Sequence, residues 1–203
     1  MKTIEPAGIR RSLRWRPLDI AVGAGLGAVF GLVNWAASLL SSWIFPLMTA
    51  LLPGLASLLH GLFYFPCTLA LLILRKPGAA VYVGAVSVLV EILPGNAYSG
   101  PMILIEALLE ALCAEVAYGI FRWRRWTLDV TLLGGILIAA VYNAFLLAFY
   151  YQGVSFFSPR GLIGTVCELI SGLVFPGLIS WFLFKAIRST GALDGLQAGR
   201  GRG

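Results

Sequence analysis

The chain has 203 residues, of which 59% are apolar and 12% are charged, and its mean hydropathy is +0.89. Soluble domains average about 45–50% apolar and about 25% charged residues. Fifteen Lys/Arg and nine Asp/Glu residues are too few to keep the surface of a soluble domain of this size in contact with water. The composition therefore argues strongly against a soluble enzyme and against a disordered chain, and it indicates a membrane protein.

Six apolar segments are long enough to cross the membrane as helices, since a span needs about 20 mainly apolar residues. We expect them at about 18–44, 54–74, 78–94, 101–121, 129–151 and 161–184. The first segment is too long for a cleavable signal peptide and is kept as a helix. We predict an all-α integral membrane protein with a single six-helix domain over residues 1–190. A Gly- and Arg-rich tail follows at 191–203, which we expect to be flexible and cytoplasmic.

The basic residues predict the orientation of this bundle. If the N-terminus is cytoplasmic, 14 of the 15 Lys and Arg residues fall on the inner face, and only Arg160 falls on the outer face. Cytoplasmic loops of membrane proteins carry such an excess of positive charge. We therefore expect both termini in the cytoplasm. The net charge of +6 is then a consequence of topology and of anionic lipid headgroups, and does not indicate nucleic-acid binding.

Polar side chains from all six predicted helices fall at about one depth, in the outer half of the bundle, when each residue adds about 1.5 Å of rise. They are Asn34, His60, Glu91, Glu106, Glu110, Asn143 and Glu168. An ionisable group in the hydrocarbon costs at least about 2.5–3.5 kcal/mol, so these groups should face the bundle interior or a watery cavity. The layer predicts a binding pocket that opens to the outside. The alternative is a structural cluster whose hydrogen bonds tie the helices together, at about 0.6 kcal/mol per contact.

Glu115 does not belong to this layer. It lies nine residues after Glu106, which is about half a revolution around the helix, and nearer the cytoplasm. We interpret it as a packing or coupling element.

Aromatic residues are frequent at the same depth as the polar layer. Trp35, Tyr64 and Tyr142 are candidate stacking residues among them. Aromatic faces beside carboxylates suit a flat ligand that is cationic or rich in nitrogen, through stacking, cation–π contacts and charge-assisted hydrogen bonds. The rest of the aromatic residues fit an ordinary core or the outer aromatic belt.

The first predicted helix carries a stripe of small residues. Gly23, Gly27 and Gly31 recur every four residues, with Ala21 beside them. Such a stripe permits close approach of another helix. It predicts either a docking surface for a partner subunit or internal packing against the second or sixth helix.

Several enzyme classes lack their signatures in this sequence. There is one histidine, and the motifs HExxH, GxSxG and the Walker A loop do not occur. Cys67, Cys113 and Cys167 fall inside predicted helices without metal-ligand spacing, so we expect them to be small buried residues. We therefore predict no metal, no cofactor and no catalytic activity. Any nucleotide hydrolysis that powers this protein must occur on another chain.

One stretch of the chain resembles a known family. It contains Arg75-Lys76-Pro77-Gly78-Ala79-Ala80, then Glu91, Gly95-Asn96, Ser99-Gly100-Pro101-Met102 and Ala114-Glu115. This pattern is similar to the YkoE family, the substrate-binding (S) subunits of energy-coupling-factor (ECF) importers. The resemblance implies a six-helix S subunit that captures thiamine or its pyrimidine precursor outside the cell. It would deliver the ligand by toppling within a complex with one transmembrane coupling subunit and two cytoplasmic ATPases.

The resemblance also implies roles for particular residues. Glu91 and the loop from Asn96 to Pro101 would line or cap the site, and the small-residue stripe would contact the coupling subunit. The chain departs from the family pattern at two places. Gly84 stands where the family tends to have a glutamate, and Glu110-Ala111 stands where it tends to have Gln-Gly.

We therefore favour a vitamin-capture subunit of a prokaryotic plasma-membrane importer, with thiamine or a related pyrimidine as ligand. The alternative is a stand-alone proton-coupled carrier that uses the buried carboxylates as a relay. The sequence contains no evident inverted repeat or broken helix pair, which are common in such carriers. An intramembrane enzyme is the least favoured hypothesis, because no nucleophile–base set is evident.

Overall fold

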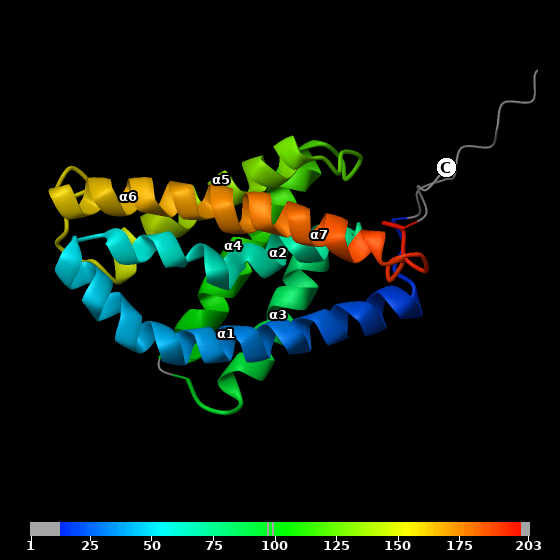
Figure 1. Ribbon diagram of the computed structural model, residues 1–203, viewed down its shortest axis with the longest axis horizontal. Helices are drawn as coiled ribbons and strands as arrows, with labels where there is room; N and C mark the ends of the chain where they lie inside the picture. Colours follow the sequence, from blue (N-terminus) through cyan, green and yellow to red (C-terminus); the bar gives the residue numbers. More distant parts are fainter. Residues whose placement is uncertain (1–12, 97, 99, 200–203) are drawn as a thin grey trace, which may run out of the picture.

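The computed structural model describes residues 13–96, 98 and 100–199 of the chain. Over these residues the protein is helical throughout (Figure 1). The elements are α1 (Pro17–Leu51), the 3₁₀ helix η1 (Leu55–Leu59), α2 (Gly61–Leu74), α3 (Ala79–Ile92), α4 (Gly100–Ile120), α5 (Leu128–Phe149), α6 (Pro159–Gly172), the π-helix η2 (Leu173–Ile179) and α7 (Ser180–Ser189). η1 leads directly into α2, and α6, η2 and α7 form one continuous rod. Counted in this way the elements make six helices, which confirms the predicted number.

Two helices are longer than the sequence led us to expect. α1 runs past the expected end at residue 44, through Pro46, and stops at Leu51. Leu52 is extended, with φ −152° and ψ 121°, because the ring of Pro53 disfavours helical geometry in the preceding residue. The last rod continues to Ser189 through the π-turn that contains Pro176. Membrane helices tolerate such prolines where neighbouring groups take up the freed backbone bonds. Thr68 of α2 contacts this turn, and its hydroxyl donates to the carbonyl oxygen of Pro176 at 2.7 Å.

Four helical stretches are long and apolar enough to cross a membrane, namely Pro17–Leu51, Leu55–Leu74, Leu128–Phe149 and Pro159–Ser189. α3 is apolar but has 14 residues, and therefore spans only about 21 Å of the roughly 30 Å hydrocarbon core. α4 is long enough but contains three glutamates. These two helices can cross the membrane only if the other helices cover their polar groups.

α2 is the centre of the bundle. Twelve of its 14 residues are buried, and it contacts α1 and every helix from α3 to α7. The outer surface is apolar as well, as Trp43 and Leu51 of α1 are 77% and 80% exposed. Apolar side chains on both the inside and the outside are typical of a bundle surrounded by lipid.

The small-residue stripe of α1 packs against α3. A Cβ on Gly27 would lie 2.6 Å from the Cβ of Val86, and one on Gly31 would lie 2.4 Å from the carbonyl oxygen of Ser87. A Cβ on Gly23 would lie 2.8 Å from the ring of Tyr82, which also belongs to α3. The stripe therefore packs internally, mainly against α3, and the predicted second helix meets it only at Gly23, where a Cβ would lie 3.3 Å from Leu74. The three glycines are buried and offer no surface to a partner subunit, whereas Ala21 is exposed.

A network of polar contacts joins α1 to the link between α2 and α3. The ammonium group of the buried Lys76 lies 3.4 Å from the carboxylate of Asp19 and donates to the carbonyl oxygen of Arg14 at 2.6 Å. Trp15 donates from its indole nitrogen to the carbonyl oxygen of Pro77 at 3.1 Å. These contacts hold the start of α1 beside the start of α3.

Glu115 of α4 completes this end of the bundle. Its carboxylate accepts from the backbone nitrogen of Ala80 at 2.9 Å, in the first turn of α3, and from the indole nitrogen of Trp123 at 3.2 Å. The first amides of a helix lack partners within it and attract negative charge. Glu115 therefore acts as a cap for α3, which agrees with the packing interpretation.

The expected flexible tail is packed over most of its length. Leu193, Leu196 and Ala198 are buried in the hydrophobic core, and the guanidinium of Arg16 donates to the carbonyl oxygen of Gly195 at 3.1 Å. The leucines among the glycines give residues 191–199 apolar area to bury. Residues 200–203 lie outside the described part of the chain. The first and last described residues thus lie at the same end of the bundle (Figure 1).

The close α1–α3 contact can be tested with two glycine substitutions. We expect Gly31→Ala to reduce the free energy of unfolding by about 1–3 kcal/mol, because the new methyl group overlaps the Ser87 backbone. Gly25→Ala is the matched control, since its Cβ would meet nothing within 4 Å. The better helix propensity of alanine should leave this control unchanged or slightly more stable. Thermal unfolding in detergent measures both, and equal Tm values would contradict the contact.

Candidate functional site

A cavity of about 140 Å³ lies among α1, α2, α3, α4 and α5. It is at the end of the bundle opposite to the Lys76 and Glu115 contacts, because it is lined by the end of α3, the first half of α4 and the end of α5. Six of the predicted site residues line it, which are Asn34, His60, Glu91, Glu106, Glu110 and Tyr142. The structure therefore brings together polar side chains that are up to 108 positions apart in the sequence.

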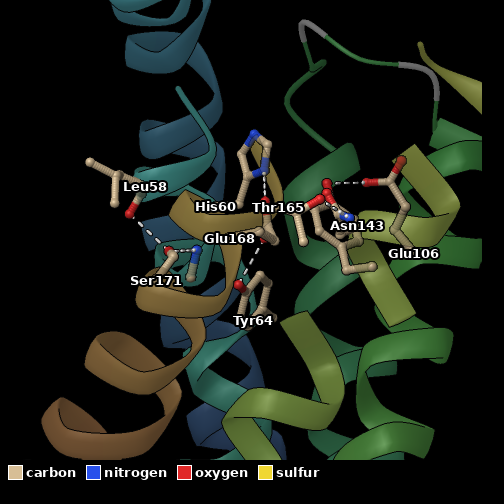
Figure 2. Close-up of polar contacts among 10 residues, drawn as sticks. Leu58, His60, Tyr64, Glu106, Asn143, Thr165, Glu168 and Ser171 are labelled. Carbon is tan, nitrogen blue, oxygen red and sulfur yellow. Dashed lines mark hydrogen bonds and ion pairs between the residues drawn. The ribbon is translucent and has the colours of Figure 1, made fainter. Parts of the chain in front are cut away.

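His60 lies between η1 and α2, and α6 fixes its position. Ser171 of α6 donates from its hydroxyl to the carbonyl oxygen of Leu58 at 2.8 Å and accepts from the backbone nitrogen of Gly61 at 2.8 Å (Figure 2). Gly61 permits this approach, since a Cβ there would lie 2.7 Å from the Ser171 carbonyl oxygen. The backbone on both sides of His60 is thus attached to α6.

Glu168 and Tyr64 lie behind His60 and do not line the cavity. The Glu168 carboxylate accepts from Nδ1 of His60 at 2.7 Å and from the hydroxyl of Tyr64 at 2.9 Å, as Figure 2 shows. Tyr64 and Glu168 are both fully buried. A carboxylate only accepts hydrogen bonds, so it holds the proton of a neutral imidazole on Nδ1 and leaves Nε2 as an acceptor. The sequence predicted that Glu168 and Tyr64 contact the ligand. In this structure they lie behind His60 and orient its ring.

The His60 ring also has two aromatic neighbours in the cavity. Phe45 and Tyr142 approach it edge to face, with ring centroids 5.3 Å and 5.6 Å from that of His60. Phe45 was not among the predicted site residues and lies one position past the expected end of the first helix. Tyr142 is a lining residue as predicted.

Trp35 and Asn96 hold the segment after α3 and do not line the cavity. The indole nitrogen of Trp35 donates to the carbonyl oxygen of Gly95 at 2.8 Å. The amide nitrogen of Asn96 donates to the carboxylate of Glu91 at 2.9 Å. Tyr98, from the same segment, does line the cavity, and its hydroxyl is hydrogen-bonded to that of Ser41 at 2.9 Å.

Asn143 lies outside the main cavity. Its amide nitrogen donates to the hydroxyl of Thr165 at 2.9 Å (Figure 2), beside a second hollow of about 20 Å³. That volume is enough for about one water molecule. Asn143 and Tyr142 are adjacent and point about 100° apart around the helix. In this structure Tyr142 faces the cavity, whereas Asn143 faces Thr165.

The carboxylates in the cavity differ in their protein partners. Glu106 accepts from the hydroxyls of Tyr142, at 3.4 Å, and Tyr150. Glu91 accepts from Asn96. Glu110 is 7% exposed and, within the described part of the chain, has no hydrogen bond or ion pair.

Two further polar atoms of the cavity wall are buried and unpartnered in the described structure. One is the hydroxyl of Ser87, and the other is the side-chain oxygen of Asn34, whose amide nitrogen donates to the Phe63 carbonyl oxygen. Ser87 was not among the predicted site residues. It lies four residues before Glu91 and therefore on the same helix face, which is the signal that could have identified it.

The cavity is lined mainly by acidic and aromatic side chains. Among the described residues that line it are three carboxylates, and neither a lysine nor an arginine is present. Aromatic rings from α1, α2 and α5, and from the segments after α3 and α5, cover much of the rest, namely those of Phe45, Phe63, Tyr98, Tyr142, Tyr150 and Tyr151. Such a wall favours a cationic or donor-rich flat ligand.

Known proteins resemble this chain in sequence. The model of the family described as "ABC-type cobalt transport system, permease component" matches residues 18–141. A protein of Bacillus subtilis (strain 168), named "Putative HMP/thiamine permease protein YkoE", is 32% identical over 143 residues, which are 70% of each chain. The chain belongs to the YkoE family.

The fold of this YkoE family member agrees with that assignment. A crystal structure of an S-component of an ECF transporter matches it with a TM-score of 0.81 and 26% identity, over 92% of each chain. The protein is therefore a transport subunit of the S-component type in the prokaryotic plasma membrane, which it crosses several times. Family membership implies a non-enzymatic role. Although the family description names cobalt, no group of three or more His, Cys, Asp or Glu side chains among the described residues is arranged to hold a metal ion.

The contrast between Glu168 and Glu110 gives a stability prediction. We expect Glu168→Ala to reduce the free energy of unfolding by about 3–5 kcal/mol, because it leaves His60 and Tyr64 without their buried acceptor. Glu110→Gln should leave the stability unchanged or increase it, because it removes no protein contact. Thermal unfolding in detergent compares the two variants. A Glu110→Gln variant as unstable as Glu168→Ala would show that Glu110 has a structural partner.

Proposed function

We propose that this protein captures thiamine or a related pyrimidine on the extracellular side of the membrane. The observation that carries the proposal is the cavity, in which three carboxylates and buried unpartnered acceptors face aromatic rings without a neighbouring lysine or arginine. A nitrogen heterocycle with amino substituents supplies the missing donors and stacks on the rings. The name of the Bacillus subtilis relative, which mentions HMP and thiamine, supports the same ligand class.

The charge distribution supports an extracellular opening. Of the ten described Lys and Arg residues, nine lie at the end that holds the first and last described residues, and Arg160 lies at the other end. By the positive-inside rule the basic end is cytoplasmic, and both termini with it. The cavity is then in the outer half of the membrane, where a ligand can enter without crossing the bundle.

Transport then requires partner subunits. The sequence contains no Walker A loop, so we propose that ATP hydrolysis occurs on two cytoplasmic ATPases, joined to this chain by a transmembrane coupling subunit. The similarity to an S-component of an ECF transporter supports such a complex. Because the glycine stripe is covered by α3, the coupling subunit would contact an exposed part of α1, and the small residues Ala21 and Gly25 are exposed there.

Calorimetry on the purified protein tests ligand capture. We expect submicromolar binding of thiamine or of hydroxymethylpyrimidine, and we expect Glu91→Gln to weaken it strongly, since Glu91 lines the cavity. Glu115→Gln is the matched control, because Glu115 is also buried and hydrogen-bonded but lies at the other end of the bundle. Failure of both compounds to bind the unaltered protein would refute the proposal.

Uptake into vesicles distinguishes the importer subunit from the proton-coupled carrier. We expect uptake to require ATP and the co-purified coupling and ATPase subunits. Uptake by this chain alone, driven by a pH gradient, would establish the carrier instead.

Reporter fusions test the orientation. A fluorescent protein fused to the C-terminus should fluoresce, and a phosphatase in its place should be inactive, because we place this end in the cytoplasm. A phosphatase inserted at Gly153, in the turn between α5 and α6, should be active. The reverse pattern would place the cavity on the cytoplasmic side.

A further inference from the structure

Glu110 is the exception among the buried glutamates of the helices. Glu115 caps α3, and Glu168 holds His60 and Tyr64. Glu91 and Glu106 accept from neighbouring side chains. Glu110, of similar burial, has no such partner in the described part of the chain. A buried carboxyl in the hydrocarbon region without a partner is expensive, so its presence calls for a functional explanation.

Two other atoms of the same cavity have unused hydrogen-bonding capacity. The side-chain oxygen of Asn34 and the hydroxyl of Ser87 are buried and unpartnered, in residues that are 7% and 3% exposed. The Asn34 oxygen can only accept, and Glu110 accepts with at least one of its oxygens. A ligand that satisfies both must therefore present at least two hydrogen-bond donors to different walls of the cavity.

A carboxyl group pairs well with one particular ring edge. Where a ring nitrogen stands beside an exocyclic amine, one carboxyl oxygen accepts from the amine, and the other shares a single proton with the ring nitrogen. The same two parallel hydrogen bonds form whether the shared proton comes from a protonated carboxyl group or from a protonated ring nitrogen. The pairing therefore requires no change in the charge of any other side chain. Such two-point pairing is stronger and more selective than a single contact.

The size of the cavity limits the ligand further. Its volume of about 140 Å³ is close to the roughly 150 Å³ of an engineered protein cavity that binds one benzene ring. One six-membered ring with small substituents fills such a space. A ligand with two linked rings would have to leave its second ring outside this space.

We propose that Glu110 is a specificity-determining residue, which pairs with the amine-bearing edge of a single-ring aminopyrimidine, and that the cavity prefers this class of ligand to two-ring thiamine. The inference rests on the proposed function, because it assumes that the cavity is the capture site. Asn34 accepts from a second donor of the ligand, such as a hydroxymethyl group. Ser87 occupies the same wall and can donate or accept.

A thermodynamic cycle tests the pairing directly. Calorimetry compares 4-amino-5-hydroxymethyl-2-methylpyrimidine with the same compound without the amine, on the unaltered protein and on Glu110→Met. For the unaltered protein we expect the amine to improve the affinity by about 10- to 100-fold, as expected for a hydrogen bond to a charged group. For Glu110→Met the two compounds should bind with nearly equal affinity.

Two further variants make the cycle specific. Glu110→Gln should restore part of the discrimination, because a carboxamide can also form two hydrogen bonds with the amine-bearing edge but without the charge. Glu115→Gln is the matched control on the same helix. Glu115 is also buried and hydrogen-bonded but lies at the other end of the bundle and does not line the cavity, so the effect of the amine should remain as in the unaltered protein.

The outcomes separate this inference from the proposed function. If neither thiamine nor the aminopyrimidine binds, the proposed function and this inference both fail. If thiamine binds more tightly than the aminopyrimidine, or if the amine improves binding to Glu110→Met as much as to the unaltered protein, only this inference fails. The inference is supported if the aminopyrimidine binds more tightly than thiamine and its amine is coupled to Glu110.

Discussion

The hydrocarbon core of the membrane requires that every polar group inside the bundle finds its partner within the protein or its ligand. This requirement accounts for the arrangement of the buried glutamates. Glu168 reaches from α6 to two residues of the α2 region, and Glu115 reaches from α4 to the first turn of α3. Each carboxylate therefore joins two helices, and the satisfied acids are also the contacts that fix the positions of these helices.

The same requirement connects the packing of the glycines to the cavity. Gly27 and Gly31 bring α1 into backbone contact with α3, so that Asn34, one turn later, faces the same space as Ser87 and Glu91. Gly61 allows α2 to approach α6 closely, which places His60 in front of Glu168. Close helix contacts thus position the polar wall, and the acceptors left without protein partners define the chemistry of the ligand.

The two ends of the bundle differ in their contacts. At the basic end, Asp19 and Lys76 form a buried pair, and the segment around Leu193 and Leu196 packs on the core. At the other end, the segment after α3 is held by Trp35 and Asn96, close to the cavity. The structure combines a firmly connected basic end with a hollow at the opposite end, which suits the proposed capture from one side of a membrane.

The sequence alone determined that this is a helical membrane protein, how many helices it has, and at what depth its polar residues lie, because apolar length and rise per residue are local properties. It could not determine which way each helix faces. Tyr142 lines the cavity whereas Asn143 bonds to Thr165, although the two have the same depth. Likewise the glycine stripe predicted a close contact, but only the tertiary structure identified α3 as the neighbour. Rotation about a helix axis is decided by the packing of the neighbouring helices, and a single sequence contains no direct signal for it.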